Sequence, residues 1–210
     1  MALRYDPAMP IARKRPPRVD SRLPQILDAA AAQFAAKGFQ AASIRDIVAT
    51  VGMLPGSLYC HFATKDDLLA AVYAEGVRRI SQAVEAAVAR HEDPWDRLEA
   101  ACAAHLEALL EQDSYASVVV GVSPATVPAV APAMIALRDG YERLFAALVD
   151  AVPLPPRTSR RALRLMLLGA LNWTPVWYRR GGEHSPARLA RSFVRLLRAN
   201  ARAADPAQRP

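Results

Sequence analysis

Glycine and cysteine are both scarce in this chain, which has nine glycines and two cysteines among 210 residues. Few glycines beside frequent alanine runs favour helices over sheet, and the only strand-like stretch, residues 117–122, is short. The two cysteines, Cys60 and Cys102, do not suggest a disulfide framework. The sequence therefore predicts an all-α protein in a reducing compartment.

Long apolar segments are also missing. Charge and proline interrupt residues 1–18, which leaves no apolar segment of the kind found in signal peptides. The longest uncharged apolar stretch near the C-terminus, residues 165–178, is too short to span a bilayer. We therefore expect a cytoplasmic protein without membrane contact. Its hydrophobic content of 52% is enough for a sizeable core.

Basic residues gather at both ends of the chain, whose net charge is +7. Residues 1–22 carry six basic and two acidic side chains, residues 23–156 carry nine and sixteen, and residues 157–210 carry twelve and two. Basic ends suggest contact with a polyanion, although a solvated helix face is the simpler interpretation of the C-terminal arginines. Prolines and clustered basic residues predict a disordered basic arm over residues 1–20.

Helical periodicity predicts about nine helices. Three short ones come first: one from Ser21 to Gly38, one from Ser43 to Gly52, and one that begins at Pro55, a residue favoured at a first helical position. Longer helices follow at about residues 64–90, 93–109, 133–152, 160–178 and from 185 onward.

Two pairs of reactive side chains are candidates for a catalytic site or a metal site. Cys60 and His61 are neighbours, so on a helix they point about 100° apart, whereas a nucleophile and its base must lie within hydrogen-bonding reach. Cys102 and His105 share a helical face, but a zinc site needs three or four ligands at defined spacing. The sequence therefore predicts no enzyme, no catalytic residue, no metal site and no cofactor.

Residues 43–62 have the length of a helix-turn-helix motif, with a tight turn at Gly52. The short second helix would expose hydroxyl, phenol and imidazole groups of Ser57, Tyr59 and His61, and such groups bind phosphate oxygens well. Lys65 would add a charge beside free backbone N–H donors in the first turn of the next helix. This surface predicts a contact with double-stranded DNA.

Residues 26–72 resemble the DNA-binding domain of TetR-family transcriptional regulators. The resemblance rests on "ILDAA", "KGF", "SIRDI", "GSLYCHF" and "KDDLL". It implies the following DNA contacts: Ser43, Pro55, Gly56, Ser57, Tyr59, His61 and Lys65. The chain departs from the family at Leu54, where a Ser or Thr cap is common, and at Pro55, where Lys or Arg is common.

The resemblance also implies an all-α homodimer whose last two helices form a four-helix bundle with those of the partner. The helix at 160–178 is too apolar for the surface of a monomer, which agrees with a dimer seam. The expected interface consists of Leu163, Met166, Leu167, Ala170, Leu189, Phe193, Leu196 and Leu197.

The family resemblance further implies a small-molecule site in the C-terminal domain, and residues 169–190 resemble a branch that senses acyl-CoA thioesters. Trp173 and Trp177 could stack on a ring, or they could anchor the dimer core instead. The site should be apolar, with walls from residues 98–109, 115–122 and 134–148. The expected ligand-binding residues are His105, Tyr115, Met134, Arg138, Tyr141, Phe145, Trp173 and Trp177.

These features together predict a ligand-responsive repressor that leaves a palindromic operator when a small apolar or acyl-CoA-type effector binds. The alternative is a helical small-molecule carrier, or an enzyme, that does not bind DNA. The expected division of the chain is a basic arm at 1–20, a DNA-binding domain at 21–66, a ligand-binding and dimerisation domain at 67–200 and a disordered tail at 201–210.

Overall fold

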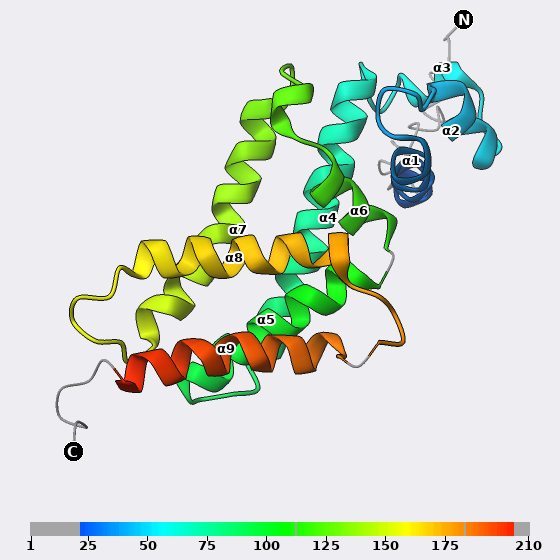
Figure 1. Cartoon of the computed structure of the whole chain (residues 1–210). Coiled ribbons are helices and arrows are strands. Elements are labelled where there is room, and N and C mark those ends of the chain that lie inside the picture. The colour runs from blue at the N-terminus through cyan, green and yellow to red at the C-terminus, as the bar shows by residue number, and fades with distance from the viewer. Residues whose placement is uncertain (1–21, 112, 183, 204–210) are drawn as a thin grey trace, which may run out of the picture.

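The structure is a computed structural model that describes residues 22–111, 113–182 and 184–203, and in these residues it is all-α (Figure 1). Within these ranges the chain forms nine α-helices, one short 3-10 helix and no strand. The α-helices are α1 (Leu23–Lys37), α2 (Ile44–Thr50), α3 (Pro55–Leu58), α4 (Lys65–Val88), α5 (Pro94–Leu110), α6 (Ser114–Gly121), α7 (Ala131–Ala151), α8 (Arg160–Trp177) and α9 (Pro186–Ala203).

Local capping signals set most helix starts. The Thr64 side chain accepts the Asp67 N–H at 3.0 Å, and the Asp67 carboxylate accepts the Thr64 N–H in return, which completes the capping box that opens α4. The Asp93 carboxylate accepts two backbone N–H groups at the start of α5. Gly38 ends α1 with a φ of 77°, a conformation that glycine adopts without strain.

The first three helices and the start of α4 lie at one end of the molecule, and α4 runs from there into the centre (Figure 1). Apolar side chains of α1 to α4 form one core cluster with Tyr115, Val118 and Met134 from α6 and α7. α4 therefore crosses the boundary expected at residues 66 and 67, and a single core joins the two predicted domains.

A second core cluster lies in the C-terminal part and contains side chains of α4, α5, α7, α8 and α9. α5 supplies Trp95, Leu98, Cys102 and Leu106 to this cluster, and α7, α8 and α9 pack their apolar stripes on it. α4 and α6 cross closely at Gly76, where a built Cβ would lie 2.7 Å from Val119 Cγ2. The glycine therefore permits this crossing distance.

Two segments have a local conformation that their sequence alone did not indicate. The strand-like residues 117–122 are mostly helical, because Asp113 caps α6 and residues 115, 116 and 118 bury one helical face in the core. Residues 201–203 belong to α9 rather than to a tail. The predicted basic arm and the rest of the predicted tail lie outside the described residues. In the part of the chain that is described, no helix is long and apolar enough to cross a membrane.

Candidate nucleic-acid interface and ligand cavity

The helix-turn-helix unit is built from α2, the turn at Gly52 and α3. Ser43 caps α2, because its Oγ accepts the Asp46 N–H at 3.1 Å. The Asp46 carboxylate accepts a hydrogen bond from Lys37 Nζ at 3.0 Å, which lowers the pKa of that carboxyl. Gly52 makes the turn with a φ of 64°. The unit is therefore fixed from both sides of α2, by its cap and by its link to α1.

α3 turns its polar side outward. Leu58 is fully buried and holds the helix to the core, whereas Gly56 and Ser57 are exposed and Tyr59 is 55% exposed. Leu54, at the N-cap of α3, makes no side-chain cap hydrogen bond and is 76% exposed. The motif thus offers hydroxyl and phenol groups to a partner, as the sequence predicts, and also an exposed leucine.

The rest of the predicted DNA contacts lie around this helix. Ser43 and Pro55 are exposed, and His61 is half-buried. Cys60 is exposed, and its thiol lies 3.8 Å from the carbonyl oxygen of Gly56. The structure therefore brings Ser43 and the predicted residues from 55 to 61 together on one end of the molecule.

Lys65 differs from the expected free cation. Its ammonium group donates to the carbonyl oxygens of Phe39 at 2.8 Å, Gln40 at 3.3 Å and Ala42 at 3.1 Å. It also lies 4.5 Å from the centre of the Phe39 ring. Because an ammonium group has three donors, Lys65 must leave a carbonyl to bind a phosphate. It ties the loop after α1 to the start of α4.

A cavity of about 420 Å³ lies between α4, α5, α6, α7 and α8, a size within the ordinary range for small-molecule sites of roughly 300–1,000 Å³. Four of the predicted ligand-binding residues line it: His105, Arg138, Tyr141 and Trp173. The other lining residues are Tyr73, Val77, Ile80, Leu109, Val119, Val120, Glu142, Leu168, Asn172 and Val176.

The remaining predicted ligand-binding residues do not line this cavity. Met134 and Phe145 are fully buried core residues, and the Phe145 ring packs behind the cavity against His105 and Tyr141 at centroid distances of 5.8 and 5.5 Å. Trp177 is 48% exposed at the end of α8. The apolar periodicity of these segments identified buried faces, but it did not distinguish a cavity wall from solid core.

Tyr115 is the fourth predicted ligand-binding residue that does not line the cavity. It lies instead at a contact between helices. Its hydroxyl donates to Asp28 Oδ1 at 2.8 Å, and the Arg79 guanidinium lies 4.0 Å from its ring centre. Arg79 also donates to Glu75 at 2.8 Å. Hydrogen bonds from Arg78 and Arg79 lower the Glu75 pKa to about 2. Tyr115 therefore joins α6 and α4 to α1, which packs on α2 of the helix-turn-helix unit.

Sequence reasoning missed the wall that α4 provides and, apart from Trp173, the wall that α8 provides. Tyr73, Val77 and Ile80 share one helical face, which looked like an ordinary core stripe. On α8, Leu168 and Asn172 are four residues apart and face the cavity together. The sign in the sequence that Asn172 lines the cavity was its polar side chain within an apolar helix.

A chain of hydrogen bonds crosses the cavity wall. His105, which is buried, lies with Nδ1 2.6 Å from the Tyr141 hydroxyl and with Nε2 3.1 Å from Asn172 Oδ1. Burial lowers the pKa of His105 to about 4, so the imidazole is neutral at pH 7. Burial also raises the pKa of Tyr141. The three residues come from α5, α7 and α8.

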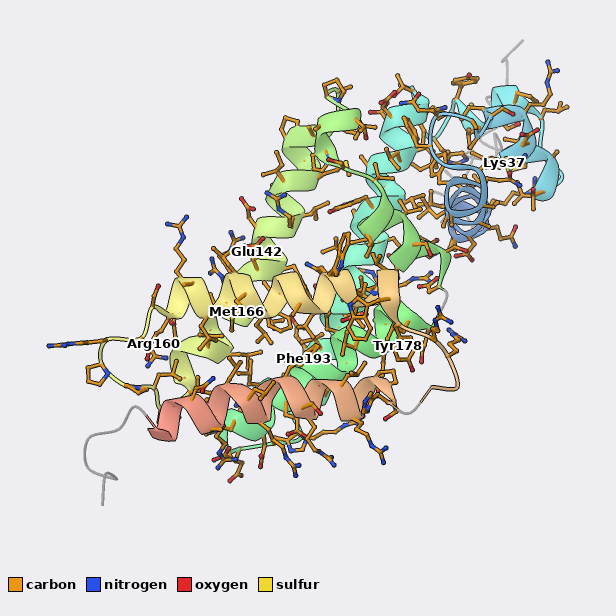
Figure 2. The ribbon with its side chains drawn as sticks, viewed as in Figure 1. Lys37, Glu142, Arg160, Met166, Tyr178 and Phe193 are labelled. Carbon is orange, nitrogen blue, oxygen red and sulfur yellow. The ribbon has the colours of Figure 1, made fainter. Side chains whose placement is uncertain are left out.

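Charges of both signs lie at the rim of the cavity. Figure 2 shows Glu142 on α7 beside α8. Its carboxylate lies 3.8 Å from Arg138 and 3.9 Å from Arg164, which is one helical turn before Leu168 on α8. Arg138 is also 3.7 Å from the Asp139 carboxylate. The rim therefore has balanced charge.

The expected dimer residues fall into two groups. Met166, labelled in Figure 2, is 59% exposed, and Ala170 and Leu196 are also exposed. Leu163 and Phe193 are half-buried. Leu167, Leu189 and Leu197 are at most 8% exposed in the chain's own core, so they have almost no surface to lose to a partner. The expectation for these three is corrected: they pack inward, because adjacent helical residues point about 100° apart.

Sequence comparison places this architecture in a family. The family described as "Bacterial regulatory proteins, tetR family" matches residues 26–72, and "Tetracyclin repressor-like, C-terminal domain" matches residues 91–200. The HTH-type transcriptional repressor KstR2 of Mycobacterium tuberculosis is 46% identical over 52 residues, which are 25% of this chain and 26% of the relative. The match therefore spans only about a quarter of this chain and about a quarter of that relative.

The match to several solved structures of the same fold covers nearly the whole length of those chains. The superantigen PfiT has a TM-score of 0.74 at 27% identity, over 84% of this chain and 96% of that one. AibR in complex with isovaleryl coenzyme A and operator DNA has a TM-score of 0.72 at 21% identity, over 83% and 97%. The ketosteroid transcriptional regulator KstR2 of M. tuberculosis has a TM-score of 0.67 at 22% identity, over 87% and 96%.

The two family matches occupy the helix-turn-helix unit and the C-terminal helices that surround the cavity, and the second alone covers more than half of the chain. This chain belongs to the TetR family of bacterial regulatory proteins.

Proposed function

We propose that this chain is a transcriptional regulator that binds duplex DNA through α2 and α3 and responds to a small molecule in the cavity. One observation carries the proposal. α4 begins at Lys65, directly after the helix-turn-helix unit in the chain, and its residues Tyr73, Val77 and Ile80 form a wall of the cavity. A single rigid helix thus connects the nucleic-acid surface to the ligand site.

In this proposal α3 enters the major groove, and the groups around it bind the DNA backbone. Ser43 uses its oxygen as a helix cap and keeps its hydroxyl proton for a phosphate. Ser57, Tyr59 and His61 supply further polar contacts, with Pro55 and Gly56 allowing close approach. Lys65 joins them only by exchanging a carbonyl for a phosphate.

A homodimer positions two such units. Outward apolar side chains on α8 and α9, which include Met166 and Leu196, form the proposed seam. Dimeric helix-turn-helix proteins place their recognition helices in successive major grooves about 34–36 Å apart on a palindromic site. Relatives support the DNA-binding role, because KstR2 is named a transcriptional repressor and AibR is seen with operator DNA.

Repression ends, in this proposal, when an effector favours a conformation that fits the operator poorly. A ligand shifts the population only by its differential affinity for the two conformations. Val119 and Val120 of α6 line the cavity, while Tyr115 of the same helix bonds to Asp28 of α1. A displacement of α6 therefore reaches the DNA-binding unit directly. A small apolar or acyl-CoA-type effector agrees with the cavity and with the isovaleryl coenzyme A bound to AibR.

The proposal assigns no enzymatic role to the chain. His105 is held by two hydrogen bonds, and burial raises the pKa of the Cys102 thiol, so neither group is an activated base or nucleophile. Cys60, the other thiol, is exposed on the far helix-turn-helix unit.

The test is a selection of bound duplexes from a random-sequence pool by the full chain. We expect enrichment of a palindrome with two equal half-sites. Tyr59→Phe, which removes only a hydroxyl, should weaken binding to the selected and to scrambled duplexes by a similar factor, because a phosphate contact reads no sequence. A pool that remains random after several rounds would refute the proposal.

A further inference from the structure

Apart from the ion pair of Arg138 and Glu142, the polar lining of the cavity is concentrated in one group of side chains. His105, Tyr141 and Asn172 meet there from three different helices, and all three line the cavity. His105 is buried, Tyr141 is half-buried and Asn172 is exposed. Polar groups that converge from separate elements fix the orientation of a ligand in many small-molecule sites. The pattern of donors and acceptors in this group indicates which ligand atom it can bind.

The donor and acceptor roles follow from the contacts. Asn172 Oδ1 can only accept a hydrogen bond, so His105 Nε2 carries the proton over the 3.1 Å contact. The imidazole is neutral, so Nδ1 has a lone pair, which accepts the Tyr141 O–H at 2.6 Å. The carbonyl of Asn172 is thus engaged, and its amide nitrogen keeps two N–H donors at the cavity.

The charge of the lining decides between a charged and a neutral acceptor. Arg138 and Glu142 are the charged groups among the described residues that line the cavity, and they lie 3.8 Å apart with opposite signs. Arg164 faces the same carboxylate, and Asp139 faces Arg138. Each cation therefore already has an anionic partner, and a ligand carboxylate would compete with Glu142 for it.

We infer that Asn172, oriented by His105 and Tyr141, donates to a neutral carbonyl oxygen of an otherwise apolar effector. This inference rests on the proposed role of the cavity as the effector site. A ketone and the carbonyl of a thioester share the required chemistry. In a thioester the acyl part would occupy the cavity, and the polar carrier would extend past the rim. Tyr141 and His105 are positioning residues, because they act through the amide.

The experiment measures binding to the full chain without DNA, by tryptophan fluorescence, to which Trp173 at the cavity contributes, and by calorimetry. The probes have a matched chain length: 2-undecanone, decanoyl coenzyme A, decanoate and decylamine, with coenzyme A alone as a control for the carrier. We expect 2-undecanone to bind at least tenfold more tightly than decanoate or decylamine. A comparison of the affinities of decanoyl coenzyme A and 2-undecanone shows whether the coenzyme A part adds affinity.

Asn172→Asp is the decisive variant, because it keeps the oxygen that accepts from His105 and replaces the two donors with an acceptor. It should weaken 2-undecanone about tenfold or more and should not weaken the decylammonium ion. Tyr141→Phe should narrow the preference for ketone over amine, since the tautomer of His105 is no longer fixed. Glu142→Gln should strengthen decanoate, because it removes the anionic partner of Arg138. Ile135→Ala, at an exposed position of α7 outside the cavity lining, is the control and should leave 2-undecanone within twofold.

Three results would overturn the inference: ketone binding by Asn172→Asp within twofold of the wild type, tighter binding of decanoate than of the ketone by the wild type, or no binding of any probe by folded protein. Because no DNA is present, these results do not depend on operator binding. Failure of the regulator proposal would appear instead in the selection of duplexes.

Discussion

His105 is a titratable side chain that the fold removes from water. It is 3% exposed, and burial brings its pKa from the usual 6.5 to about 4. The neighbouring groups Tyr141 and Cys102 have raised pKa values and stay neutral in this range. Between these two values the unfolded chain binds a proton that the folded chain does not.

The free energy of unfolding should therefore fall as the pH is lowered through this window, because the proton uptake favours the unfolded state. Between pH 7 and pH 5 we expect a loss of roughly 2 kcal/mol from His105. Chemical denaturation at several pH values measures it. His105→Asn should lack this part of the slope, and His91→Asn, at an exposed site, is the control. Equal slopes in wild type and His105→Asn would contradict the assignment.

Leu54 is a second residue with a local consequence. It occupies the N-cap of α3 with extended backbone, makes no cap hydrogen bond and is 76% exposed. Leu54→Ser should supply the missing acceptor and raise the free energy of unfolding by about 1 kcal/mol. Leu54→Ala controls for the loss of the leucine, and it should change little. If serine and alanine give the same stability, the cap does not form.

At the scale of helices, α4 and α6 cross closely at Gly76. A Cβ atom added to Gly76 would lie 2.7 Å from Val119 Cγ2 and 3.1 Å from the Tyr115 carbonyl oxygen. A Cβ atom added to Gly140 in α7 would lie 3.5 Å from the flexible end of Arg143. Both glycines lie inside helices, so alanine gains about 1 kcal/mol of helix propensity at either position.

The two substitutions should therefore have opposite effects. Gly140→Ala should stabilise the protein by about 1 kcal/mol. Gly76→Ala should destabilise it by roughly 1–2 kcal/mol, because the displacement of α6 costs more than the propensity gains. Denaturant titration measures both changes. Stabilisation by Gly76→Ala would show that α6 moves away at little cost.

Helix starts were the most predictable feature at this scale, because they depend on a few adjacent residues. Ser43, Thr64 and Asp93 cap their helices as expected. The run at 117–122 was misleading, because β-branched residues are tolerated in a helix whose inner face is buried. Its conformation depends on α1 and α4, which lie far away in the sequence.

Cavity walls and links between helices were harder to predict. Tyr115 looked like a ligand contact, but its hydroxyl reaches Asp28, 87 residues away. Asn172 was missed, because only the crossing of α5, α7 and α8 brings it to His105. Lys65 was expected at the surface, yet three carbonyl groups from the loop after α1 surround it. Periodicity shows which face is buried, not which partner it meets.

For the whole molecule, the outer face of α8 and α9 decides the assembly. Leu165, Met166, Trp173 and Leu196 are exposed by 49 to 65%, and large apolar patches of this kind mark interfaces. Met166→Glu should dissociate a dimer into chains of 22.8 kDa, because a charge would be buried in the seam. Analytical ultracentrifugation measures this change in mass. Ile135→Glu, at an exposed position of α7, should leave the dimer intact, and a dimeric Met166→Glu variant would contradict the proposed seam.

The central claim is that the chain binds a specific DNA sequence through its helix-turn-helix unit. The most direct measurement is an anisotropy titration of a duplex from the DNA upstream of the chain's own gene, repeated at several salt concentrations with a scrambled duplex as competitor. The account predicts saturable binding that survives excess scrambled duplex and weakens linearly in log affinity against log salt concentration. Binding that is equal for both duplexes, or flat across salt concentrations, would contradict it.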